Sequence, residues 1–283
     1  MRNQYRNVEI PALNKFSLSI SHNDPHGFSV EREPQLHIHE YFEIYFNLSG
    51  DVSFVVENNT YSVSRGTVII TRPFEYHHCI FHSTLEHDHY CLHFSCAGNK
   101  NFLAPFIERE KGKNNCITLG SEATTALINH FEKLMQSNGT SEIDSVCHFL
   151  RILQIIQDNN LSNDADIPMI IPENLAKVLD IINTSYQHPI SVATLASDIY
   201  VSINTLERYF KRYLNLSPTE YIKRKRLSAA LTLLKNNTPV SSVASQCGFS
   251  DTSNFIQVFK RSFGKTPYQY LKSGHLKGLD FNE

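Results

Sequence analysis

Histidines and one glutamate form the first group of residues whose spacing suggests chemistry. His37 and His39 are separated by a single residue, Glu43 follows on the same stretch, and His77 comes later behind Pro73. Alternate residues of a strand point to the same side, so His37 and His39 are expected to share a face. Three imidazoles and a carboxylate could hold a divalent metal, and they could equally hydrogen-bond a small polar ligand.

Further polar and aromatic side chains extend this group. Tyr45 and His93 fall on neighbouring stretches that also read as strands. Aromatic faces with a few hydrogen-bonding groups suit a sugar or sugar acid. The expected ligand contacts are His37, His39, Glu43, Tyr45, His77 and His93. His87 and His89, in a charged stretch, are expected to be solvated.

A second group of candidate residues lies in a duplicated segment near the C-terminus. Residues 190–221 and 240–270 are similar, with an offset of 48 at Ala196/Ala244 that becomes 49 at Phe210/Phe259. Each copy is predicted to be a short helix, a turn, a second helix, a turn and a third helix. Ser217-Pro218-Thr219-Glu220 and Thr266-Pro267-Tyr268-Gln269 predict a capping box before each third helix.

The second helix of each copy has an apolar side and a hydrophilic side. The apolar side is predicted to hold Ile203, Leu206, Phe210, Tyr213 and Leu214 in the first copy and Phe255, Phe259 and Phe263 in the second. Asn and Gln can bond adenine, Arg can bond guanine, and Lys and Arg can bond phosphates, so the opposite sides fit a DNA major groove. A solvated helix face is the alternative. The expected DNA contacts are Asn204, Glu207, Arg208, Lys211, Arg212, Ser253, Asn254, Gln257, Lys260 and Arg261.

Residues 174–272 resemble the DNA-binding domain of the AraC/XylS family of bacterial transcription regulators. The resemblance rests on Gly248-Phe249-Ser250-Asp251, Asn254-Phe255, Phe259-Lys260-Arg261-Ser262-Phe263-Gly264-Lys265-Thr266-Pro267 and Tyr270. It implies two helix-turn-helix units joined by a long helix over about 219–236, entering major grooves ~34 Å apart. It also implies base contacts by Asn204, Glu207, Arg208, Ser253, Asn254 and Gln257. Leu271 stands where the family often has Arg.

The histidine motif resembles the two sequence motifs of the cupin superfamily. His37, His39, Glu43 and Gly50 match the first motif, and Gly66 through His77 match the second. The resemblance implies an N-terminal β-barrel. In a cupin enzyme His37, His39, Glu43 and His77 would hold iron, manganese or zinc. Sensor barrels of AraC-type regulators commonly carry a similar pattern without metal, so we favour ligand contact and expect no cofactor.

The elements that must position these residues differ along the chain. Short alternating stretches over residues 16–95 predict strands of a small barrel or sandwich. Two helices are predicted within 121–157, broken at 137–141, and they either pack on the barrel or form a dimer interface. A polar linker over 158–173 precedes a helix at about 173–186.

Charge divides the chain in the same way. Residues 1–173 contain 12 Lys and Arg against 21 Asp and Glu, whereas residues 174–283 contain 14 against 7. A basic half fits a polyanion-binding module. The six cysteines show no metal or disulfide spacing, and neither a signal peptide nor a membrane span is expected, so we predict a cytoplasmic location.

Together these patterns predict an α+β protein of two domains. Residues 1–157 are expected to form a cupin-like β-barrel followed by a helical hairpin, with a linker at 158–173 and an all-α domain with two helix-turn-helix units at 174–283. The predicted function is a sequence-specific transcription regulator without catalytic activity, controlled by a small polar ligand. Its expected partners are double-stranded DNA, the effector, a second copy of the chain, and RNA polymerase if it is an activator. A metal-dependent cupin enzyme and a constitutive DNA binder whose barrel only dimerises are the alternatives.

Overall fold

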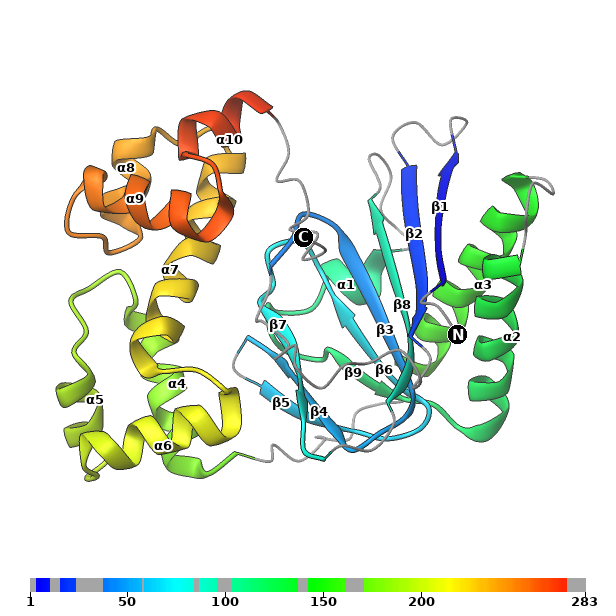
Figure 1. Ribbon diagram of the computed structural model, residues 1–283, viewed down its shortest axis with the longest axis horizontal. Helices are drawn as coiled ribbons and strands as arrows, with labels where there is room; N and C mark the ends of the chain where they lie inside the picture. The colour runs from blue at the N-terminus through cyan, green and yellow to red at the C-terminus, as the bar shows by residue number, and fades with distance from the viewer. Residues whose placement is uncertain are drawn as a thin grey trace. The chain divides into compact units, whose positions relative to one another are not determined.

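The computed structural model describes residues 4–10, 16–23, 38–57, 59–83, 87–95, 103–136, 142–160 and 171–273. His37 and most of the predicted linker therefore lie outside the described residues. The chain divides into two compact units, one made of most of residues 1–169 and the other mainly of residues 170–283. The first is a β unit with helices, and the second is helical (Figure 1).

The β unit contains two antiparallel sheets. The larger sheet has the order β1-β2-β8-β3-β6-β9 and the smaller has the order β5-β4-β7. Their strands are β1 Gln4–Ile10, β2 Phe16–Asn23, β3 Phe42–Ser49, β4 Val52–Val56, β5 Asn59–Val63, β6 Thr67–Thr71, β7 His77–Phe81, β8 Asp88–Ser95 and β9 Cys116–Thr118. Within the described residues the strands pair as two sheets and do not close into one hydrogen-bonded cylinder.

Both faces of strand β3 are covered, which explains why its sequence lacks a simple alternation of apolar and polar residues. Phe42, Ile44 and Phe46 belong to a core shared with helices of this unit. Tyr45, which points to the other side, belongs to a second core with Phe54 and other residues of the smaller sheet. The odd-numbered residues of β3 therefore face the interior between the sheets.

The helical hairpin covers the outer face of the larger sheet. Helices α2 (Ser121–Gln136) and α3 (Glu142–Asn160) bury Leu127, Phe131 and Phe149 against that face. A short helix α1 (Ala104–Ile107) contributes Phe106 to the same core. The prediction that this hairpin packs on the β domain is confirmed.

The helical unit contains both predicted repeats. Its helices are α4 Glu173–Ser185, α5 Val192–Asp198, α6 Ile203–Leu214, α7 Pro218–Lys235, α8 Val240–Gln246, α9 Thr252–Phe263 and α10 Pro267–Ser273. The first helix-turn-helix is α5–α6 and the second is α8–α9, with α7 between them in the chain (Figure 1). The second helix of each pair buries aromatic residues, with Phe210, Phe255 and Phe259 all fully buried.

Helix starts in this unit follow the predicted capping. The Ser217 hydroxyl accepts from the Glu220 amide at 3.1 Å, with Pro218 at the first helical position. The Glu220 carboxylate pairs instead with Lys223 and Arg224, so only the N-cap half of this predicted box is formed. Thr266 and Gln269 form a reciprocal box, because each side chain accepts from the backbone amide of the other. Each such cap satisfies an amide that the first helical turn leaves without an intrahelical partner.

None of the helices formed by the described residues is long and apolar enough to cross a membrane. The described cysteines, Cys79, Cys91, Cys116, Cys147 and Cys247, are all free thiols.

Candidate effector site and DNA-contacting surface

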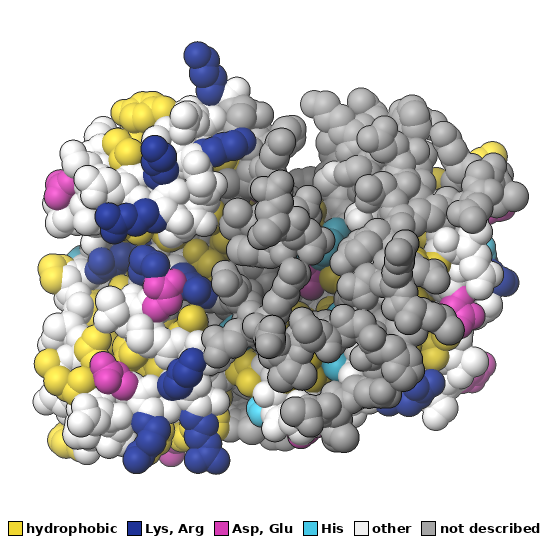
Figure 2. All heavy atoms as spheres, in the orientation of Figure 1, with side chains coloured by type: hydrophobic (Ala, Val, Ile, Leu, Met, Phe, Trp, Pro, Cys, Tyr) yellow, Lys and Arg dark blue, Asp and Glu magenta, His cyan; other side chains and the backbone are white. Residues whose placement is uncertain are grey.

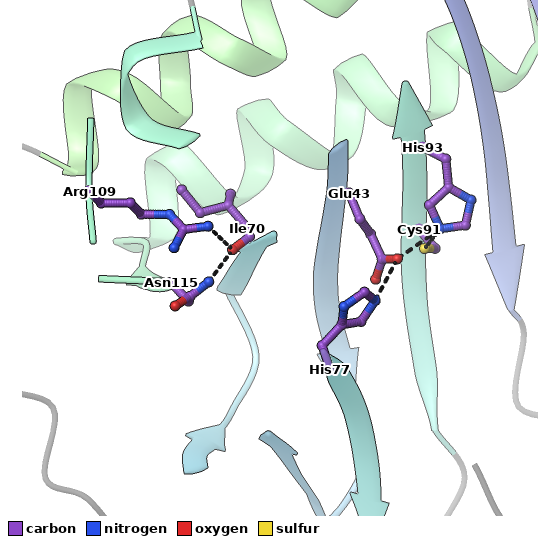
Figure 3. A network of polar contacts seen from close by, with 7 residues as sticks. All are labelled: Glu43, Ile70, His77, Cys91, His93, Arg109 and Asn115. Atoms are coloured by element: carbon purple, nitrogen blue, oxygen red, sulfur yellow. Dashed lines mark hydrogen bonds and ion pairs between the residues drawn. The ribbon is translucent and has the colours of Figure 1, made fainter. Parts of the chain in front are cut away.

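A carboxylate bonded by two imidazoles lies in the interior between the sheets. Glu43 Oε2 accepts from His77 Nε2 at 3.1 Å and from His93 Nε2 at 2.9 Å (Figure 3). Glu43 is on β3, His93 pairs with it from β8, and His77 begins β7 of the smaller sheet. The structure therefore brings together three of the six predicted ligand contacts.

A thiol adjoins this cluster. Cys91 lies two residues before His93 on β8, and its sulfur is 3.1 Å from His93 Nε2. Burial raises the pKa of Cys91 well above its usual value, and the nearby Glu43 raises it further, so the thiol stays protonated. Cys91 was not among the predicted site residues, although its two-residue spacing from His93 on a strand indicated a shared face.

The donor set of this cluster suits a divalent metal. Within the β unit it offers the Glu43 carboxylate and the imidazoles of His77 and His93. His39 is 4% exposed and groups with the other compact unit. Imidazole and carboxylate are common ligands of zinc and of iron. The carboxylate is nevertheless satisfied by two imidazoles without an ion, and His37, the fourth residue of the predicted metal set, lies outside the described residues.

A second buried polar cluster lies further along the same strands. The Tyr45 hydroxyl donates to Asn47 Oδ1 at 2.9 Å and lies 2.5 Å from His87 Nε2. The rings of His87 and His89 stack with centroids 4.3 Å apart. The prediction that His87 and His89 are solvated is wrong, because they are only 4% and 8% exposed. The charged stretch that suggested a loop leads directly into β8, which starts at Asp88.

Burial keeps this second cluster uncharged. It lowers the pKa of His87 to about 4 and lowers that of His89 well below its usual value. Burial also raises the pKa of Tyr45 well above 10. At neutral pH the cluster is therefore a set of neutral hydrogen-bonding groups.

Several buried side-chain atoms lack a hydrogen-bond partner within the described part of the chain. Among them are Asn47 Nδ2 and Thr71 Oγ1, on side chains that are 0% and 1% exposed. Thr71 pairs directly with Glu43 across β3 and β6. An unmade hydrogen bond costs about 1–3 kcal/mol in a buried place, so such groups are normally satisfied by water or by a ligand.

A separate polar network fixes the segment that follows α1. The Ile70 carbonyl at the end of β6 accepts from Asn115 Nδ2 at 2.7 Å and from Arg109 at 3.4 Å (Figure 3). It ties residues 109–115 to the larger sheet and is structural.

The predicted DNA-contacting side chains form the second candidate site. All ten are exposed: Asn204, Glu207, Arg208, Lys211 and Arg212 on α6, and Ser253, Asn254, Gln257, Lys260 and Arg261 on α9. Lys and Arg side chains are spread over the visible face of the helical unit (Figure 2). Ser202 caps α6 and Asp251 caps α9 by accepting from amides of the first turn, which orients each helix start.

One expectation for this unit needs correction. Ile203 was predicted to face inward, but it is the first residue of α6 and is 43% exposed. On α7, Arg226 donates to the carbonyls of Tyr186 and His188 at 2.9 and 3.0 Å. Lys223 and Arg224 both pair with Glu220 on their own helix.

Comparison with known proteins identifies the same two parts. Residues 22–153 match the model of the AraC-like ligand binding domain, and residues 195–273 match a helix-turn-helix domain model. The probable transcriptional regulator LumQ of Photobacterium leiognathi is 26% identical over 86% of this chain and 94% of its own length. The HTH-type transcriptional activator RhaR of Mannheimia succiniciproducens is 24% identical over 93% of this chain and 97% of its own.

Among solved structures, ToxT from Vibrio cholerae O395 aligns with 94% of this chain and 99% of its own, at 13% identity and a TM-score of 0.37. The two family models match the two units in the order in which the chain presents them. The chain is an AraC-family transcription regulator, with an AraC-like ligand-binding domain followed by a DNA-binding helix-turn-helix domain.

Proposed function

We propose that a small polar effector binds in the interior between the two sheets and changes how the helical unit binds DNA. The observation that carries this proposal is a row of polar side chains on the inner face of the larger sheet, of which four are buried and His93 is half-buried. Glu43, Tyr45 and Asn47 alternate along β3, and Thr71 and His93 flank Glu43 on the neighbouring strands. Burying polar groups costs free energy unless each group is hydrogen-bonded, so their presence in this interior favours a binding role.

The chemistry of the row favours a molecule with several hydroxyl groups. Asn47 Nδ2 can donate to a ligand oxygen, and Thr71 Oγ1 can donate or accept. Glu43 and its two imidazole partners can accept and donate hydrogen bonds at the other end of the row. A sugar or sugar acid offers both kinds of group at close spacing, together with an apolar face for Tyr45.

The effector acts only if it binds two arrangements of the regulator unequally. The DNA contacts proposed are the ten exposed residues of α6 and α9, with Arg208 and Gln257 reading base edges and Lys211 and Lys260 holding phosphates. LumQ and RhaR bear the names of a regulator and an activator. We accordingly propose activation of transcription, with RNA polymerase as a partner and no catalytic activity. A protein that acts on chromosomal DNA works in the cytoplasm of a bacterium.

A homodimer is part of the proposal. On α3, Ile143 is 71% exposed and Leu150 is 45% exposed, and the exposed Cys147 lies between them at helical spacing. A second copy of α3 could cover this stripe. Light scattering at micromolar concentration should give the mass of a dimer, and Ile143→Asp with Leu150→Asp should give a monomer. A monomeric wild-type protein would contradict the proposed homodimer.

The test of the effector site begins with mapping bound DNA across the genome. A recovered fragment is then titrated with the full chain, with and without a panel of sugars and sugar acids. Glu43→Gln and Thr71→Val should abolish the shift in DNA affinity caused by the active compound and leave the affinity without it unchanged. Ser62→Ala, an exposed position on β5, is the matched control. An unchanged response in both variants would remove this interior as the effector site.

The metal alternative is tested separately. Protein purified without a histidine tag should contain no stoichiometric zinc, iron or manganese if Glu43, His77 and His93 bind an organic effector directly. One tightly bound metal per chain, lost in Glu43→Gln, would favour a metal-dependent sensor or enzyme.

A further inference from the structure

Tyr200 occupies an unusual backbone conformation at the turn that leads into α6. Helix α5 ends in a Schellman motif, in which the Tyr200 amide bonds the Ser197 carbonyl and the Val201 amide bonds the Ala196 carbonyl, both at 3.0 Å. Tyr200 is the left-handed residue of this motif, with a φ of 56°. Glycine is the usual residue there because a Cβ disfavours this conformation.

The second repeat shows what the equivalent position normally holds. Gly248 ends α8 in the same motif, with its amide bonded to Ser245 and the Phe249 amide bonded to Ala244. Its φ is 75°. A Cβ on Gly248 would lie 2.5 Å from the Tyr186 carbonyl oxygen, so no other residue fits.

The first repeat leaves the same position open to solvent. The Tyr200 side chain is 96% exposed, the most exposed large hydrophobic side chain in the described part of the chain. The ring therefore contributes almost nothing to the core, while its backbone carries the strain of a left-handed residue. A strained residue that stabilises nothing inside the chain indicates a role outside it.

The position of Tyr200 identifies the partner as DNA. It lies two residues before Ser202, whose hydroxyl caps α6 by accepting from Thr205 at 3.1 Å. Ile203, at 43% exposed, follows at the first position of the same helix. In helix-turn-helix proteins the start of the second helix approaches the base edges, so the turn before it adjoins the sugar-phosphate backbone. Tyrosine hydroxyls are among the groups that bond phosphates and sugars.

We propose that Tyr200 is a DNA-contacting residue that packs on a deoxyribose and donates its hydroxyl to a phosphate beside the half-site read by α6. The contact rests on the proposed docking of α6 in the major groove. It carries no net charge, so it releases no counterion. It should therefore raise affinity for all sequences without changing the salt dependence, unlike a lysine contact.

The test compares full-length variants on a DNA fragment recovered by genome-wide mapping and on an unrelated duplex. Tyr200→Gly should raise the melting temperature by a few degrees, because it relieves the left-handed strain, and should weaken binding to both duplexes about tenfold. Tyr200→Asn, which tolerates the same φ, should weaken binding without changing the fold. Tyr200→Phe should show an intermediate loss, and Tyr268→Ala, at an exposed tyrosine of α10, should show none.

Unchanged DNA affinity in Tyr200→Gly and Tyr200→Asn would overturn the proposal. So would a loss of transcription activation at unchanged DNA affinity, which would assign the ring to a protein partner. Arg208→Ala in the same experiment distinguishes a failure of the Tyr200 contact from a failure of the docking of α6. If Arg208→Ala weakens binding and the Tyr200 variants do not, only the tyrosine contact fails, and if neither has an effect the docking of α6 fails as well.

Discussion

The helical unit has its proposed functional polar groups on its surface, whereas the β unit has its own in its interior. In the helical unit, Arg208 and Gln257 are exposed while Phe210 and Phe259 are fully buried on the other side of the same helices. In the β unit, Glu43 is 3% exposed and faces inward from its strand. A surface that reads DNA needs a rigid core behind it, whereas a site that encloses a small molecule must take polar groups into its own core.

The largest expected effect tests the rigid core of the helical unit. Phe210→Ala and Phe259→Ala remove equivalent rings that are each 0% exposed in their repeats. Each should lower the free energy of unfolding by about 3–5 kcal/mol, because a large cavity is left in a packed core. Urea unfolding followed by circular dichroism measures the loss. Leu271→Ala, at a half-exposed position, is the control, and a loss in the control as large as in the phenylalanine variants would contradict this view of the core.

The polar interior of the β unit should make that unit sensitive to acid. Burial lowers the pKa of His87 to about 4 from an ordinary value of 6.5. In the unfolded chain His87 takes up a proton near pH 6.5, whereas in the folded unit it stays neutral. Stability is therefore complete above about pH 6.5 and falls by about 3 kcal/mol as the pH drops toward 4.

Hydrogen exchange at pH 7 and pH 4.5, after correction for the intrinsic exchange rate, measures this loss on the strands of the β unit. His87→Gln should flatten the pH dependence, and His188→Gln, at an exposed position of the helical unit, should leave it as in the wild type. An equal pH dependence in wild type and His87→Gln would show that His87 does not stay neutral in the folded protein.

A smaller effect distinguishes base reading from backbone contact on α6. Arg208→Ala should cost about 1–3 kcal/mol of binding free energy on the recovered fragment and relax the preference at one base pair. Affinity measurements on a set of single-base variants of the fragment give this preference. An equal loss on every sequence would move Arg208 from base reading to phosphate contact.

The smallest effect is expected for Lys211→Ala. It should weaken all sequences similarly, and the slope of log affinity against log salt should decrease in magnitude by about 1. Titrations between low and physiological salt measure the slope. A sequence-dependent loss with an unchanged slope would show that Lys211 does not hold a phosphate.

The helical unit was largely predictable because its signals are local. The N-cap at Ser217 and the apolar stripe of Phe255 and Phe259 each specify structure over a few residues. The exceptions are long-range contacts. Periodicity does not reveal that Arg226 bonds the end of α4, or that Ile203 begins its helix on the exposed side.

The interior of the β unit was predictable only in part. The alternation of apolar and polar residues predicts on which face of a strand each side chain lies. It does not predict which strands pair or which strands face one another across a sandwich. The sequence thus indicated Glu43, His77 and His93 as site residues, whereas the convergence of Glu43 and His93 and the presence of Cys91 beside them required the pairing of β3 with β8. His87 and His89 were misassigned because polar residues in a charged stretch resemble a loop, and β1, β7 and β9 were not predicted as strands.

The most direct experiment tests whether the polar faces of α6 and α9 both dock on one stretch of DNA. Methylation interference on the recovered fragment should show two groups of major-groove contacts about one helical turn apart. Arg208→Ala should remove contacts in one group and Gln257→Ala should remove contacts in the other. A single group of contacts, or two groups that both depend on the same residue, would contradict the docking of α6 and α9 in successive grooves.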